Sequence, residues 1–271
     1  MNFYKELELV LEATEPAKKF LLFEKFYENF QVNRLKFEDD FTPKKFEKPS
    51  YSQFCKTVAP QKVPKRSNLT AVAGQVNLLH AVAHIEYSAI DLALDAAYRF
   101  QGLPREYYAD WLEVAEDEIR HFLMLERLLG ELGAAYGDIE VHDALFEASQ
   151  KTQTLLERMA VVPRYLEANG LDATPMILKK LKKLPTNDMI EKIIENLKII
   201  LEEEVEHVSK GDVWFKYACV RENVEEYIYF EIIAKYYPRG FLRPNDLNIE
   251  ARKEAGFSCS ELKVMAKREV C

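Results

Sequence analysis

Two copies of the pattern Glu-x-x-His occur in the chain, at Glu118 and His121 and again at Glu204 and His207. Residues three apart in a helix project from the same side, so each carboxylate and its imidazole can converge on one point. Carboxylate oxygens and imidazole nitrogens are ligands that iron and manganese both accept. The repeated pattern therefore predicts a metal site with one imidazole for each of two metal ions.

Both copies stand in apolar stripes of helical spacing, where a helix bundle normally has leucine. The first stripe consists of Trp111, Val114, Ala115, Phe122, Leu125 and Leu128, and the second of Ile193, Leu197, Ile200, Leu201, Val208 and Trp214. Acids in such positions become buried, and a buried charge without a partner costs many kcal/mol. Divalent cations would remove that cost, whereas arginine or lysine partners are the alternative without a metal.

A third acid, Glu86, lies in the apolar stripe of an earlier helical segment. It stands 16 residues before Gly102, and Glu118 stands 16 residues after it. A helical hairpin folded at Gly102 would therefore bring the two carboxylates level on antiparallel neighbours. Glu86 and Glu118 are predicted to face the same metal ions.

The fourth acid is predicted to be Glu167, which follows apolar residues at helical spacing, and Glu157 remains the alternative. Glu167 stands 17 residues before Leu184, and Glu204 stands 17 residues after Asn187. This symmetry again predicts a level pair on antiparallel helices. The complete predicted ligand set is Glu86, Glu118, His121, Glu167, Glu204 and His207. It would hold two divalent metal ions, iron or else manganese, and no catalytic residue or cofactor beyond these is predicted.

Four long helical segments must position these ligands, and together they predict an all-α four-helix bundle. They are expected at 69–100, 104–132, 142–183 with a kink, and 187–236. One or two further helices are expected within 3–31, interrupted near Pro16, and a loop with short helices from Pro238 onward. The predicted division is 1–68 for N-terminal helices and an extended linker, 69–236 for the dimetal bundle and 237–271 for a C-terminal tail.

Composition narrows the class of protein. The 271 residues are 48 % hydrophobic with only 9 Gly and 11 Pro, which suits a large helical core. A formal net charge of -8 argues against broad nucleic-acid binding. No apolar run of about 18 residues suggests a membrane span, and the N-terminus does not resemble a secretory signal, so a cytoplasmic location is expected. The 4 cysteines include no C-x-x-C pair and are expected to be free thiols.

The segment 43–66 is the most basic part of the chain. The prolines in this segment prevent it from forming a regular helix. Its basic residues are Lys44, Lys45, Lys48, Lys56, Lys62, Lys65 and Arg66, against the single acid Glu47. The segment is expected to be a solvated linker, or alternatively a docking strip for an acidic protein partner or RNA.

Several motifs resemble the ferritin-like superfamily and, more narrowly, an uncharacterised bacterial ferritin-like family. They are HIE, DWLEVAEDEIRHF, LEANGLD and EEEVEHVSKGDVWF, spread over about residues 70 to 217, with NIEARKEAGF in the tail. The paired Glu-x-x-His and the acid in LEAN are also similar to the di-iron hydroxylase of tRNA, whose E-A-R segment supplies a metal ligand. That resemblance favours Glu167 over Glu157, although Asn169 stands where the hydroxylase has arginine.

Three functions are compatible with these features. The first is an oxidase or hydroxylase that activates O2 at a di-iron centre and acts on a small molecule or a modified base. The second is iron binding or peroxide detoxification without an organic substrate. The third is a metal-stabilised module that binds a protein partner through segment 43–66. The ligand set favours the first, an oxidoreductase.

Overall fold

The computed structural model describes residues 1–38, 40–241 and 246–271, and these residues form helices and no strand. The all-α helical fold predicted from the sequence is confirmed. The contacts divide the chain into two compact units, Met1–Glu147 and Ala148–Cys271, which are described separately. The three-part division at residues 68 and 236 stays a prediction. Part of the loop expected after Pro238 lies outside the described residues.

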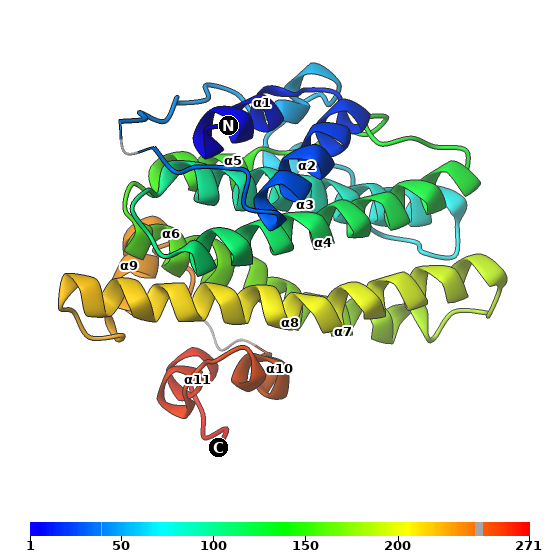
Figure 1. Cartoon of the computed structure of the whole chain (residues 1–271). Coiled ribbons are helices and arrows are strands. Elements are labelled where there is room, and N and C mark those ends of the chain that lie inside the picture. Colours follow the sequence, from blue (N-terminus) through cyan, green and yellow to red (C-terminus); the bar gives the residue numbers. More distant parts are fainter. Residues whose placement is uncertain (39, 242–245) are drawn as a thin grey trace. The chain divides into compact units, whose positions relative to one another are not determined.

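The described residues of the first unit form four complete helices, of which two are much longer than the others (Figure 1). They are α1 (Phe3–Glu12), α2 (Pro16–Gln31), α3 (Val72–Arg99) and α4 (Arg105–Glu131). Asn2 caps α1 by accepting a hydrogen bond from the backbone N–H of Lys5, and Pro16 occupies the first turn of α2, where no N–H is required. The break predicted near Pro16 is therefore confirmed. Helix α1 packs against both α2 and α3.

The two long helices α3 and α4 form an antiparallel hairpin. Helix α3 ends at Arg99 and α4 begins at Arg105, after Pro104. Gly102 lies between them with φ +67°, a left-handed conformation that glycine adopts without the steric cost other residues meet. The hairpin predicted at Gly102 is confirmed, and it sets the register between the two helices.

The basic segment is mostly extended, with two short 3-10 turns, η1 (Ser50–Gln53) and η2 (Pro60–Lys62). Backbone hydrogen bonds fix it to the loop after α4, because the Val58 N–H donates to the carbonyl of Val141 at 2.8 Å. The side chain of Lys56 also pairs with Glu140 at 2.5 Å. The segment is therefore a wrap attached to the first unit along part of its length.

The second unit is built around one long helix. Helix α8 (Asp188–Glu222) packs against the preceding broken helix, which consists of α6 (Leu155–Val161), the π-helical segment η3 (Val162–Glu167) and α7 (Ala168–Leu181). Shorter helices complete the unit: α9 (Ile228–Tyr236), α10 (Ile249–Glu254) and α11 (Cys259–Ala266). Helix α5 (Ala144–Lys151) begins at the end of the first unit.

The helices predicted over 142–183 and 187–236 both turn out to be interrupted. The first consists of α5, α6, η3 and α7, and its kink is the π-helical segment that contains Pro163. The second ends at Glu222, because Asn223 adopts a left-handed conformation with φ 54° and its N–H caps the last turn. The chain then resumes as a separate helix, α9.

The expectation that all four cysteines are free thiols was wrong for two of them. Cys259 and Cys271 form a disulfide with their Cα atoms 6.0 Å apart. Cys55 and Cys219 are buried free thiols. The pair was missed because its spacing matches no short cysteine motif and only the fold of the tail brings the two residues together. None of the helices in the described ranges combines the length and hydropathy that a bilayer crossing requires.

Candidate metal centre

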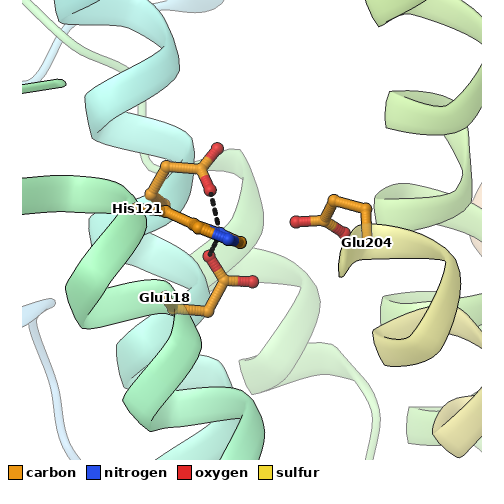
Figure 2. Close-up of side chains that lie close together, drawn as sticks. Glu118, His121 and Glu204 are labelled. Atoms are coloured by element: carbon orange, nitrogen blue, oxygen red, sulfur yellow. Dashed lines mark hydrogen bonds and ion pairs between the residues drawn. The ribbon is translucent and has the colours of Figure 1, made fainter. Parts of the chain in front are cut away.

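The α3–α4 hairpin assembles the first half-site, which we define as Glu86, Glu118 and His121. Nδ1 of His121 lies 3.2 Å from Oε2 of Glu86 and 3.6 Å from Oε2 of Glu118. Figure 2 shows Glu118 and His121 projecting together from their helix. The hairpin register therefore brings Glu86 and Glu118 to the same imidazole, as the symmetric spacing around Gly102 predicts.

The first half-site is buried and favours a cation. The exposed fractions of Glu86, Glu118 and His121 are 3 %, 0 % and 0 %. Burial by itself lowers the pKa of His121, but its hydrogen bonds with Glu118 and Glu86 outweigh burial and raise that pKa to about 11. The two carboxylates thus favour a positive charge at this position. Here it is the charge of the protonated imidazole, and a bound metal ion would supply it instead.

The donor atoms of the first half-site also fit a metal ion in geometry. One ligand atom from each of the three residues lies within 4.8 Å of the others. Two donors bound to one cation at about 2.0–2.2 Å, at right angles, lie about 3 Å apart. The N–O distances in the half-site are close to this value. A buried cluster of two carboxylates and one imidazole can therefore hold a metal ion.

Helix α8 carries Glu204 and His207, which with Glu167 we define as the second half-site. Nδ1 of His207 lies 3.7 Å from Oε1 of Glu204, and the exposed fractions of these two side chains are 1 % and 13 %. The carboxylate of Glu204 projects from α8 (Figure 2). The second Glu-x-x-His therefore has nearly the same internal geometry as the first and the same donor types.

Glu167 is the last residue of the π-helical segment η3, and it is half-buried. The segment packs closely on α8, because a Cβ added to Gly211 would lie only 2.2 Å from Cβ of Pro163. Glu167 lies four residues after Pro163, and His207 lies four residues before Gly211. In this antiparallel pair Glu167 therefore comes level with His207, about one turn from Glu204.

Glu157, the rival of Glu167, is engaged elsewhere. Its carboxylate pairs with Nζ of Lys235 on α9 at 2.6 Å and accepts a hydrogen bond from the Gln153 N–H. Burial raises the pKa of Glu157, but its bond to Lys235 outweighs burial and lowers that pKa overall. Since the chain itself supplies a cation to Glu157, Glu167 is the better candidate for the fourth acid.

Two other histidines of α3, His80 and His84, are hydrogen-bonded within the first unit. Nε2 of His80 accepts from the Gly137 N–H at 3.0 Å. His84 bonds through Nδ1 to the Tyr136 hydroxyl at 2.8 Å and through Nε2 to the carbonyl of His142 at 2.7 Å. Burial lowers the pKa of both imidazoles to about 4, so both are neutral.

Sequence reasoning missed two buried arginines near Glu167 in the fold: Arg164 lies three residues before it, and Arg252 contacts the carbonyl of Ala168, which follows it. Arg164 and Arg252 are both buried, and each forms ion pairs with acids of the second unit. Their partners are far along the chain, Glu261 for Arg164 and Asp172 for Arg252, so no local spacing indicates the pairs. The one available signal, for Arg164 alone, was an arginine in the otherwise apolar run AVVPRYL.

Fold and site together define the class of this protein as an all-helical protein with a buried Glu and His cluster that can hold a metal ion. A family model described as "Protein of unknown function (DUF455)" matches residues 12–263, and the chain belongs to this family. The chain is 37 % identical over 275 residues to an uncharacterized protein of Haemophilus influenzae, which covers 96 % of this chain and 92 % of the relative. No solved structure matches the chain.

Proposed function

We propose that the two half-sites together form one ferritin-like, carboxylate-bridged dimetal centre. The buried cluster of Glu86, Glu118 and His121 is the observation that carries this proposal. The second half-site repeats the same donor types on α8 and η3. Four glutamates bring four negative charges, which two divalent cations would balance, and this removes the cost of burying the acids.

Each ligand has a distinct role in this proposal. Glu118 and Glu204 would provide carboxylates shared by both metal ions, Glu86 and Glu167 would be further carboxylate ligands, and His121 and His207 would each hold one ion. Iron is the metal we favour, and manganese accepts the same ligands. Two iron ions bound there would supply electrons for the reduction of dioxygen. The reaction class would then be the oxidation or hydroxylation of a small molecule or a modified base.

The chain's own residues contribute burial and orientation to that chemistry. His121 and Glu118 are inaccessible to solvent and Glu86 is only 3 % exposed, so the fold keeps bulk water from the imidazole. The carboxylates of Glu86 and Glu118 converge on Nδ1 of His121 and hold that imidazole in one orientation.

Metal content followed by oxygen uptake tests the proposal. Protein purified without added metal is analysed for metals, then loaded anaerobically with Fe(II) and exposed to O2. We expect about two iron ions per chain and oxygen consumption, both lost in His121→Ala and in His207→Ala. Glu167→Gln should weaken binding of one ion, and Glu157→Gln is the matched control that should leave both bound.

The outcomes separate the three functions. Oxygen consumption that continues only while Fe(II) is being oxidised, with no turnover once iron is bound, would favour iron binding or peroxide detoxification. Two bound metals that raise stability but react with neither oxygen nor peroxide would favour a metal-stabilised binding module. A wild-type chain that binds no Fe(II) or Mn(II) would overturn the dimetal proposal.

A further inference from the structure

The C-terminal segment 248–266 holds the backbone on the C-terminal side of Glu167. Nη2 of Arg252 on α10 donates to the carbonyl of Ala168 at 3.0 Å. The same guanidinium binds the carboxylate of Asp172 on α7 through Nε at 3.1 Å and Nη2 at 2.6 Å. One buried arginine therefore ties α10 to the residue that follows Glu167 and to the next turn of α7.

Arg164 holds the backbone on the other side of Glu167. Its guanidinium is fully buried, with Nε 2.9 Å from Oδ1 of Asp212 on α8 and Nη2 2.7 Å from Oε1 of Glu261 on α11. Three aromatic rings surround the same group at 4.5 to 4.6 Å from their centroids: Phe215, Tyr229 and Phe257. The hydroxyl of Tyr229 also donates to the carbonyl of Arg164 at 3.0 Å.

These contacts surround a stretch of backbone that is not regular helix. The segment Val162–Glu167 is π-helical, a rare conformation that occurs mostly as single turns inside α-helices and is frequent at functional sites. Its shape determines where the Glu167 side chain leaves the backbone. Anchors at Arg164 and Ala168 leave that stretch little freedom, because buried, hydrogen-bonded charges have few alternative arrangements.

We propose that Arg252 and Glu261 are positioning residues for Glu167. The C-terminal segment 248–266 thereby helps to place one ligand of the metal centre. Arg252 acts on the backbone at Ala168, and Glu261 acts through the guanidinium of Arg164. This inference rests on the proposed function, since it assigns the placement of one ligand of that centre. It also accounts for the two buried arginines beside Glu167.

The test uses Co(II) titration of the full chain, because the absorption of bound Co(II) reports the number and geometry of its ligands. Arg252→Lys keeps the charge but loses the two-pronged contact, and Glu261→Gln keeps the shape but loses the charge. We expect the wild type to bind two Co(II) ions. In either variant one of the two should bind at least ten-fold more weakly, with an altered spectrum, as in Glu167→Gln.

A double variant distinguishes positioning from a general loss of stability. If Arg252 acts through Glu167, then Glu167→Gln combined with Arg252→Lys should bind Co(II) no more weakly than Glu167→Gln alone. Glu250→Gln and Lys253→Arg, exposed changes on the same helix α10, are the controls and should leave both sites intact. Thermal unfolding of the metal-free variants shows that each one folds.

Two results would overturn the inference, and they differ in what they say of the metal centre. If the wild type binds two Co(II) ions but Arg252→Lys and Glu261→Gln bind them equally well, or if the double variant shows additive losses, the centre stands and the positioning role fails. If the wild type binds no Co(II), no ligand needs positioning, and the proposed function fails as well. If Glu261→Gln does not fold, the Co(II) titration of Arg252→Lys alone tests the positioning role.

Discussion

The two half-sites carry the same kinds of ligand but position them differently. In the first, Glu86 and Glu118 come from two long, regular helices, and the hairpin at Gly102 brings both to His121. In the second, Glu167 comes from a π-helical segment within a broken helix, and ion pairs from distant residues hold that segment. Regular helix geometry positions one set, and long-range side-chain contacts position part of the other.

This difference implies that the two units respond to different mutations. A ligand on a regular helix keeps its direction as long as the helix and its turn are intact. A ligand on an irregular segment depends on every group that fixes the backbone there. The second unit should therefore be the more sensitive to changes far from the ligands, and the first to changes at the ligands themselves.

Arg164→Met should have the largest effect on stability. It leaves the buried carboxylates of Asp212 and Glu261 without their shared cation, which costs about 3–5 kcal/mol of unfolding free energy. Urea unfolding of the metal-free chain measures this, with the exposed Arg221→Met as control. A loss below about 1 kcal/mol would mean that side-chain anchors contribute little to the second unit.

Metal binding should stabilise the chain through both half-sites. With free Fe(II) or Mn(II) at about 100 times its Kd, the unfolding free energy should rise by about 2.7 kcal/mol for each ion bound. Most of that gain should vanish in His121→Ala and in His207→Ala, because each removes one imidazole ligand. Thermal unfolding with and without metal provides the comparison. A gain that survives in only one of the two variants would show that a single half-site is sufficient for binding.

Acid should destabilise the first unit through His80. Burial lowers the pKa of this imidazole from 6.5 to about 4. Between these pH values His80 is protonated in the unfolded chain but not in the folded chain. The contribution of neutral His80 to the unfolding free energy is therefore fully present above pH 6.5 and is lost as pH falls towards 4. We expect a loss on the order of 2 kcal/mol for a group of this burial.

Hydrogen exchange at pH 7 and pH 5 can locate this loss. Amides of α3 and of the loop at Gly137 should lose protection first, because the Gly137 N–H donates to Nε2 of His80. His80→Gln should reduce the pH dependence without abolishing it, because burial also lowers the pKa of His84, in the same unit, to about 4. Equal loss of protection in the second unit, whose histidine is His207, would argue against His80 as the source.

The smallest and most local changes in stability are expected from alanine substitutions at two glycines, one in each unit. A Cβ on Gly211 of α8 would lie 2.2 Å from Pro163, so Gly211→Ala should destabilise the second unit by about 1–3 kcal/mol. A Cβ on Gly130 of α4 would meet nothing within 4 Å, so Gly130→Ala should stabilise the first unit by about 0.4–1 kcal/mol. Urea unfolding of both variants checks the signs, and a neutral Gly211→Ala would show that η3 can move off α8.

The half-site of the α3–α4 hairpin could be predicted almost completely from the sequence. Apolar residues at helical spacing mark both helices, Gly102 marks the turn, and equal spacing to Glu86 and Glu118 implies that the two acids meet. Each of these signals is local, and a regular helix converts spacing along the chain directly into direction in space. The same reasoning found Glu204 and His207, which also stand on an unbroken helix, α8.

The surroundings of Glu167 could not be predicted in this way. The kink expected within 142–183 is a π-helical segment, whose shape periodicity does not indicate, and α8 ends at Glu222, well before residue 236. Periodicity continues across such breaks, because the same apolar residues can face the core from two short helices as well as from one long one. The disulfide between Cys259 and Cys271 was missed because it depends on how the tail folds back.

The sequence by itself determined that the chain is all-helical, where its long helices begin, and which glutamates and histidines stand in apolar stripes, because these properties depend on residues a few positions apart. Only the tertiary structure decided that Arg164 pairs with Glu261, 97 residues away, that Arg252 reaches the carbonyl of Ala168, and that Glu157 is neutralised by Lys235. Such contacts join segments that the sequence leaves far apart, and the energy of burying a charge is decided by which groups the fold brings to it.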